Sequence, residues 1–375
     1  MQPRQLRLVK YRSPRNGERL KKKQWILGLV VLLALVALAA YAQHKHPFHW
    51  QTFVEQFKLA DWRRICVAAG CIYLGYVFRA VRWAMLLKPN KRVSPLSLLG
   101  TQVIGFTAIA LIGRIADLVR PYLVAKKTGL PLSTQIAVYI VERLFDGGSV
   151  ALIFSSAILL APSGALPHPE VFRKFGYGGL AATLLGVLFL VSVRLAGGVV
   201  ASFTERAFGV FSKRLGHALG GKIRSFRIGL NTLRTPADFA VTLTLSLAMW
   251  GLITMAYLEG TQAFVAGPQR ESVTLAKCMV LMVISGAASV VQLPVLGWFT
   301  QIAAVEETLR NLFSLSPETS TACATTLLLV TFLGIVPVGL IWAQFEHVSL
   351  RKITVESEQA GEEIPPADES PFPVE

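Results

Sequence analysis

Long apolar runs separated by short polar segments dominate the pattern of the chain. Seven runs approach membrane-spanning length, at about 25–42, 65–87, 136–160, 177–193, 237–258, 275–296 and 321–343. A transmembrane helix needs roughly 20 predominantly apolar residues, so each run is long enough to form one. The pattern therefore predicts an all-α polytopic membrane protein.

The composition supports this fold class. Hydrophobic residues make up 53% of the 375 residues and charged residues 16%, and the mean hydropathy is +0.51. Soluble domains carry about 25% charged residues. The run at 25–42 has no small-residue cleavage site after it and precedes further spans, so we expect a retained first span rather than a signal peptide.

The placement of the +16 net charge predicts how the chain is oriented. Residues 1–24 hold nine Lys/Arg against Glu18 alone. By the positive-inside rule this tail stays in the cytoplasm, as do the basic segments 79–92, 126–127 and 206–234. A basic tail can also bind nucleic acid. Beside a membrane span, its ordinary roles are orientation and contact with anionic lipid, so no nucleic-acid partner is predicted.

Two conflicts with the charge rule predict broken, re-entrant segments. A single crossing by 94–112 would leave Lys126 and Lys127 outside, and the conflict disappears if 95–125 dips into the membrane and returns, turning near Gly113. We therefore expect a re-entrant hairpin here.

The second conflict lies near the C-terminus. Counting the last two apolar runs as full crossings leaves Arg351 and Lys352 outside, unless 275–313 is a re-entrant hairpin broken near Pro294 and Gly297. The expected topology is about six full transmembrane helices plus two re-entrant broken-helix hairpins of opposite orientation, as in an inverted repeat.

The sequence divides into three parts. Residues 1–24 form a basic cytoplasmic tail, and 25–346 form the membrane domain. Within that domain, 202–234 mixes Phe, Leu and Ile with Arg and Lys at helical intervals, which predicts an amphipathic segment on the inner surface. Residues 347–375 are acidic and Pro-rich, and we expect a disordered cytoplasmic tail.

Charged residues interrupt two of the apolar stretches. A charge in hydrocarbon costs several kcal/mol and persists only when it is paired or lies in a polar cavity. Spacings of three or four residues place these side chains on shared helix faces. The predicted substrate-binding or translocation network consists of Arg114, Asp117, Arg120, Glu142, Arg143 and Asp146, three positive and three negative.

Two interpretations of this network remain open. The arginine forks could hold a phosphate-bearing headgroup while the carboxylates orient them, or the charges could pair with one another and only fix the helix packing. Arg79 and Arg82, beside Trp83, are similarly either snorkelling anchors at the end of a span or an entrance site for an anionic lipid.

No catalytic or metal-binding constellation is discernible in the sequence. His44, His46 and His49 stand in HKHPFHW without a nearby carboxylate or cysteine to complete a metal site. The four cysteines lie in apolar runs, where thiols are usually small core residues. We therefore expect no cofactor, no metal and no enzymatic activity.

Two segments resemble a known family. The segment 113–146, GRIADLVRPYLVAKKTGLPLSTQIAVYIVERLFD, resembles the signature of the lysylphosphatidylglycerol synthase transmembrane-region family, also called the flippase-like domain. FRAVRWAMLLKP at 78–89 resembles the family's Arg-Ala-x-Arg-Trp motif. The signature residues that match are Gly113, Arg114, Arg120, Pro121, Tyr122, Leu123, Glu142, Arg143 and Asp146.

The resemblance has two departures. Asp117 stands where the family tends to have Glu. After Pro294 and Gly297 the chain has Thr300 and Gln301 where a Glu is common, so a charge is lost, and Gln301 joins Arg79 and Arg82 as a candidate for a second site. The resemblance implies the lipid-translocating membrane part without the soluble synthase domain.

The expected function is that of a lipid flippase of the bacterial inner membrane, moving an anionic or modified phospholipid between leaflets. No nucleotide-binding motif is present, so the driving force would be a gradient or simple equilibration. One alternative is a membrane enzyme acting on a polyprenyl-phosphate-linked sugar, with Glu142 or Asp146 as base. The other is a scaffold subunit. The expected partners are membrane lipids, a second copy of the chain or a lipid-modifying enzyme.

Overall fold

The computed structural model describes residues 48–162, 166, 169–210, 212–213, 216, 219–221, 235–289 and 296–362. Phe53–Glu375 form one compact unit, to which all helices from α3 to the last one belong. The basic tail 1–24, the first predicted span 25–42 and most of 211–234 lie outside the described residues.

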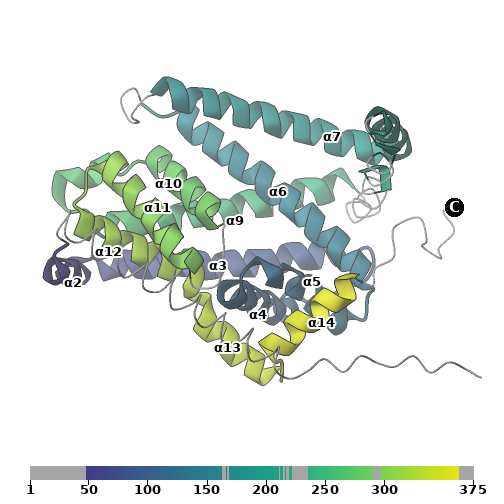
Figure 1. Ribbon diagram of the computed structural model, residues 1–375, viewed down its shortest axis with the longest axis horizontal. Helices are drawn as coiled ribbons and strands as arrows, with labels where there is room; N and C mark the ends of the chain where they lie inside the picture. The colour runs from purple at the N-terminus through teal and green to yellow at the C-terminus, as the bar shows by residue number, and fades with distance from the viewer. Residues whose placement is uncertain are drawn as a thin grey trace, which may run out of the picture. The chain divides into compact units, whose positions relative to one another are not determined.

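The described residues form helices joined by short connections (Figure 1). In chain order they are α2 Trp50–Leu59, α3 Trp62–Leu87, α4 Pro95–Ile112, η1 Arg114–Leu118, α5 Val119–Thr128, α6 Leu132–Leu159, α7 Pro169–Gly209, α9 Pro236–Gln262, η2 Gly267–Ser272, α10 Leu275–Ala288, α11 Leu296–Phe313, α12 Pro317–Leu328, η4 Leu329–Leu333, α13 Ile335–Phe345 and α14 Leu350–Glu362.

Four of the described stretches are long and apolar enough to cross a membrane, which agrees with the predicted all-α polytopic class. They are Trp62–Leu87, Pro95–Ile112, Pro236–Gln262 and Pro317–Phe345. One of them, Pro95–Ile112, is the first half of the predicted re-entrant hairpin at 95–125. By the same criteria of length and composition α6 and α7 are not among the four, and the count of six full spans stays a prediction.

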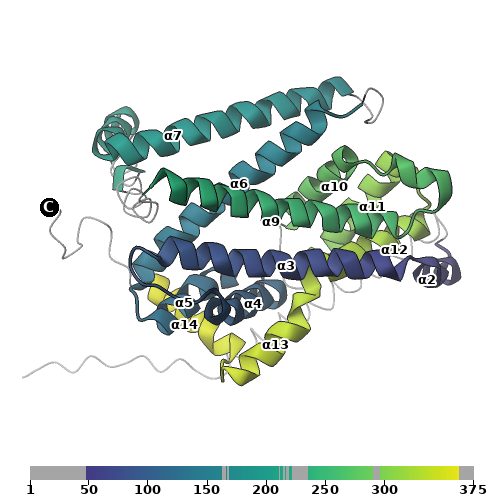
Figure 2. The same ribbon diagram turned by 180° about the vertical axis from the view of Figure 1, so that it is seen from behind.

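Helices α3 and α9 pack side by side along their length (Figure 2). Their paired ends are tied together where α3 begins and α9 finishes, because the Asp61 amide donates to the Ala263 carbonyl at 2.9 Å. Beside it, Arg64 Nη1 donates to Glu259 Oε2 at 2.6 Å. The two helices are therefore antiparallel, and α9 itself starts at a capping box formed by Thr235 and Asp238.

The segment predicted to form the first hairpin folds as a broken helix pair. Helix α4 stops at Gly113, whose φ of 93° suits glycine, and the chain continues through η1 into α5. The Thr128 carbonyl, at the end of α5, accepts a 2.7 Å hydrogen bond from Lys91 Nζ, just after α3. The segment thus returns to the end from which it started.

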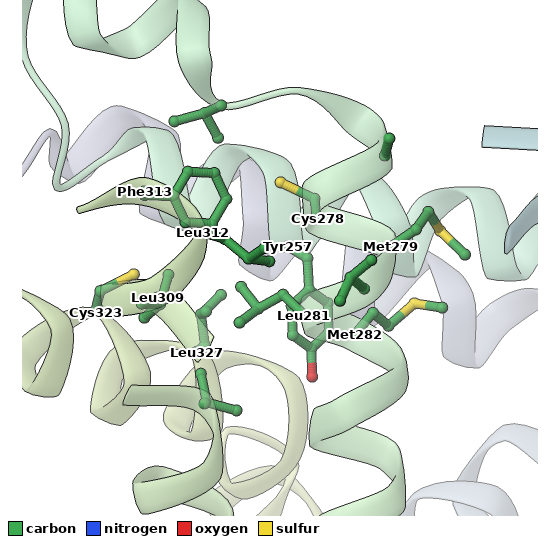
Figure 3. Packing of buried hydrophobic residues seen from close by; sticks show 14 of the residues in the cluster. Tyr257, Cys278, Met279, Leu281, Met282, Leu309, Leu312, Phe313, Cys323 and Leu327 are labelled. Carbon is green, nitrogen blue, oxygen red and sulfur yellow. The ribbon is translucent and has the colours of Figure 1, made fainter. Parts of the chain in front are cut away.

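The second hairpin is formed by α10 and α11, which pack against each other. Lys277, at the start of α10, lies over the ring of Phe313 at the end of α11, 5.2 Å from its centroid. A buried cluster that includes Leu281, Leu309 and Leu327 joins this pair to α9 and α12 (Figure 3). The pair therefore also turns back on itself.

The two hairpins start from opposite ends of the α3–α9 pair. Lys127 Nζ lies 2.8 Å from Glu346 Oε1, so the ends of α5 and α13 meet near the end of α3. At the other end, Thr319 Oγ1 donates to Gln56 Oε1 at 3.2 Å, which brings the start of α12 beside α2. The two pairs therefore have opposite orientations along α3 and α9, and the re-entrant topology stays a prediction.

The interpretation of 347–375 as a disordered tail is wrong for Leu350–Glu362, which forms α14. Ile353 and Ser357 are four residues apart and buried against η1 and α5, and Tyr122 donates to Glu356 at 3.2 Å. The prediction was based on the acidic composition of the whole segment. A helix needs apolar or small residues on only one face to pack, and its glutamates can lie on the other faces. Residues 363–375 lie outside the described part.

The contact between α13 and α4 yields a test of the packing. A Cβ on Gly339 would overlap Thr107 Oγ1 and come within 2.7 Å of Thr107 Cβ and 3.0 Å of the Val103 carbonyl oxygen. We expect Gly339→Leu to lower the melting temperature of the detergent-solubilised protein, since overpacking costs about 1–3 kcal/mol. Gly251→Leu on α9 is the control, because nothing lies within 4 Å of that added Cβ. Equal melting temperatures would contradict the close approach.

Candidate functional site

The charged residues of three helices meet in the interior of the protein. Arg79 and Arg82 come from α3, Arg120 from α5, and Glu142, Arg143 and Asp146 from α6. The α6 residues share a helix face because of their i,i+3 and i,i+4 spacing. Of these α6 residues, Glu142 pairs directly with Arg120.

Arg82 lies at the centre of the cluster. Its Nη2 donates to Glu142 Oε1 at 2.6 Å, and its Nη1 donates to Asp146 Oδ1 and to Ser246 Oγ, each also at 2.6 Å. The interpretation of Arg82 as a snorkelling anchor is wrong, because its side chain is only 1% exposed. One guanidinium fork therefore bridges two carboxylates that lie one helical turn apart.

Arg120 is held by one carboxylate, one amide and several rings. Its Nη2 lies 2.7 Å from Glu142 Oε2, and its Nε and Nη2 donate to Gln102 Oε1 at 3.0 and 2.8 Å. The guanidinium carbon is 4.4 Å from the Phe106 ring centroid. A Cβ on Gly105 would overlap Arg120 Cγ, so a glycine is what lets α4 approach this side chain. The arginine is thereby buried and fixed in place.

The other two arginines are bound less tightly. Arg79 Nη1 lies 3.6 Å from Asp146 Oδ2 and 3.8 Å from Glu142 Oε1, and it makes no hydrogen bond within the described part of the chain. Arg143 Nη2 lies 2.9 Å from Asp146 Oδ2, and its side chain is 41% exposed. Both retain N–H donors that a ligand can use.

A cavity of about 300 Å³ lies beside this cluster. Three arginines, Arg79, Arg120 and Arg143, line it together with one carboxylate, Asp117. Glu142 and Asp146 are not part of its described lining, although they hold the arginines from behind. With three positive charges and one negative charge on its described walls, the cavity suits an anionic group.

Two members of the predicted network differ in how the structure places them. Asp117 lines the cavity, and no described residue forms an ion pair with it. The backbone of Arg114 begins η1, but its side chain lies outside the part that the structure describes. The structure therefore brings together four of the six predicted residues as direct ion-pair partners.

Gln301 lines the same cavity from the second hairpin. Its Nε2 donates to Ser285 Oγ at 2.8 Å, and Tyr257 Oη donates to the same oxygen at 2.8 Å. Gln301 Oε1 is buried and has no hydrogen-bond partner among the described residues. Of the predicted second site, Arg79 and Gln301 therefore line the same cavity as Arg120, whereas Arg82 is not part of its described lining.

Several functional partners were missed by sequence reasoning. Gln102, Ser246 and Ser285 are polar residues within apolar runs, which is a weak signal that they have buried partners. Trp250 donates its Nε1–H to Asp146 Oδ1 at 3.2 Å, and an indole in an apolar run carries no such signal. The described residues contain no group of three or more His, Cys, Asp or Glu that could hold a metal ion, and His44 and His46 lie outside them.

Comparison with protein families found one match. The model of the family described as "Lysylphosphatidylglycerol synthase TM region" matches residues 25–339, which is most of the chain. Comparison with curated proteins and with solved structures found no match. The matched region includes every described helix that contributes a residue to the cavity.

The ion pairs of Glu142 give a stability test. Glu142→Gln removes the negative charge that balances Arg82 and Arg120, and breaking a buried pair typically costs about 3–5 kcal/mol. We expect a clear fall in melting temperature and in yield of folded protein. The control is Glu346→Gln, whose partly exposed pair with Lys127 is worth at most about 1 kcal/mol. If both variants melt alike, Glu142 does not stabilise the network.

Proposed function

Since the chain belongs to the lysylphosphatidylglycerol synthase TM region family, we propose that it moves a phospholipid with an anionic headgroup between the leaflets of the bacterial inner membrane. One observation carries the proposal: three arginines line a cavity in the membrane domain against a single carboxylate. An excess of buried positive charge is costly in a membrane unless an anion compensates it.

The chemistry of the cavity favours a phosphate. A guanidinium presents paired N–H groups that match the oxygens of a phosphate, and such charge-assisted pairs are about twice as strong as neutral hydrogen bonds. Arg82 takes up one oxygen of each of the two carboxylates, which leaves Arg143 and Arg79 with weaker protein contacts. These two arginines are the groups we expect to contact the headgroup.

The two hairpins supply a route through the membrane. In this proposal both are re-entrant, and the irregular backbone near Gly113 is tolerated at that depth because it faces protein and a polar cavity. Trp298 Nε1, near the start of α11, donates to the Ala110 carbonyl near the end of α4 at 3.3 Å, so α11 of the second hairpin contacts α4 of the first. Relative movement of the two would open the cavity to alternate sides, as in other transporters with broken helices.

The proposal assigns no covalent chemistry to the site. A catalytic base must reach the substrate, but the Glu142 side chain is 1% exposed and Asp146 6% exposed, and both are engaged by arginines. This favours translocation over the alternative of an enzyme acting on a lipid-linked sugar. The driving force is a gradient or equilibration between leaflets.

The transport proposal is tested by reconstitution. Purified protein in liposomes should exchange a headgroup-labelled anionic phospholipid between leaflets, and Arg143→Lys should slow this about tenfold. The lysine keeps the charge but loses the planar fork, and a charge-assisted hydrogen bond is worth about 1.5–3 kcal/mol. Arg173→Lys, at an exposed position of α7 outside the cavity, is the control. Absence of exchange, or a new covalent lipid product in mass spectra, would overturn the proposal.

The re-entrant topology is tested by labelling in a cysteine-free background. Lys126→Cys and Arg351→Cys should be unreachable by an impermeant reagent added outside, since both lie on the face that we place in the cytoplasm. Gln269→Cys, exposed in η2 at the opposite end, should react and is the positive control. External labelling of Lys126→Cys would contradict the first hairpin.

A further inference from the structure

A second, apolar groove runs between α6 and α7. It has a volume of about 1000 Å³ and is lined mostly by apolar and small side chains of these two helices, with Trp250 and Val283 contributed by α9 and α10. Helices α6 and α7 are close together where α6 ends and α7 begins, and they diverge from there in both views (Figures 1 and 2). The principal apolar lining residues are Val150, Phe154, Val171, Phe175 and Ala182.

Glycines of α7 play two different parts at this groove. A Cβ on Gly179 would come within 2.5 Å of Ser155 Oγ, and one on Gly176 within 3.2 Å of Leu159, so these two glycines allow α7 to approach α6. A Cβ on Gly178 would meet nothing within 4 Å. Gly178 lines the groove and leaves it open.

The groove adjoins the charged cavity. Arg143 and Trp250 line both spaces, and Asp146, the ion-pair partner of Arg143, also lines the groove. From Arg143 to Phe154 the groove follows α6 for about 16 Å, at 1.5 Å per residue. Half of a hydrocarbon core about 30 Å thick is about 15 Å, so this length suits a chain that spans one leaflet.

We propose that this groove holds an acyl chain of the phospholipid whose headgroup occupies the cavity, with Arg143 bound to the phosphate between them. The inference rests on the proposed function and specifies how the lipid is held. An anionic amphiphile fits a mostly apolar groove whose two basic residues, Arg143 and Lys174, outnumber its one acidic residue, Asp146. A protein helix docked on the groove would not need the adjoining charged cavity. The lipid therefore enters sideways, between α6 and α7.

The test fills the groove without disturbing the helix contact. Gly178→Leu places a side chain in open space within the groove, and we expect lipid exchange to fall at least fivefold with an unchanged melting temperature. Gly186→Leu is the matched control, since it lies on the same helix, has nothing within 4 Å and is not in the lining. Its exchange rate should equal that of the unmodified protein.

A second measurement locates the chain directly. A phospholipid carrying a photoreactive diazirine in one acyl chain is reconstituted with the protein, and the crosslinked peptides are identified by mass spectrometry. We expect labelling at Phe154 and Phe175 in the unmodified protein and its loss in Gly178→Leu. Unlabelled phospholipid should compete for this labelling better than a polyprenyl phosphate.

The outcomes separate the groove from the transport proposal. Exchange that is unaffected by Gly178→Leu, together with no labelling in the groove, overturns the inference while the proposed function stands. No exchange by the unmodified protein overturns the proposed function, and crosslinking still decides what occupies the groove. Stronger competition by a polyprenyl phosphate, or a change of oligomeric size in Gly178→Leu, shows that the occupant is not a phospholipid chain and overturns the inference.

Discussion

The bridge from Arg82 to Glu142 and Asp146 is the interaction on which the interior of this protein depends. Each of these ions alone would cost several kcal/mol in a membrane domain, and the cost is offset only when the geometry is close and the remaining polar atoms are satisfied. Donor–acceptor distances of 2.6 Å and a further bond to Ser246 supply the close geometry, although Arg82 Nε is buried without a hydrogen-bond partner among the described residues. The bridge joins α3, α6 and α9, and the contact of Arg120 with Glu142 adds the first hairpin.

The same bridge explains why the neighbouring arginines remain available. Two carboxylates could each neutralise one arginine, but four arginines lie within 4 Å of them. The bridge takes the shortest contacts, and Arg79 and Arg143 are left with weaker protein contacts beside the cavity. Structural and substrate-binding interpretations of the network are therefore compatible, because different arginines carry them. The buried fork fixes the helices, and the surplus charge is what we assign to the headgroup.

Besides the arginine–carboxylate bridge, the interior of the protein requires that its helices approach one another closely. Gly105 admits Arg120, Gly339 admits α13 against α4, and Gly179 admits α7 against α6. In a membrane, helices gain little from the hydrophobic effect and associate through such close packing and through polar contacts. The glycines thus determine where the charged cavity and the apolar groove can form.

The sequence by itself determined the fold class, the break at Gly113 and most of the charged residues of the site. These are local properties, since apolar run length, Gly113 and the i,i+4 spacing on α6 can each be read along the chain. Only the tertiary structure decided that Arg82 is the central residue, that Gln301 shares the cavity of Arg120, and that α14 is helical against α5. Each of these depends on residues 60 or more positions apart, such as Arg82 with Glu142. The pattern of one segment carries no information on which distant partner will neutralise its charge or bury its face.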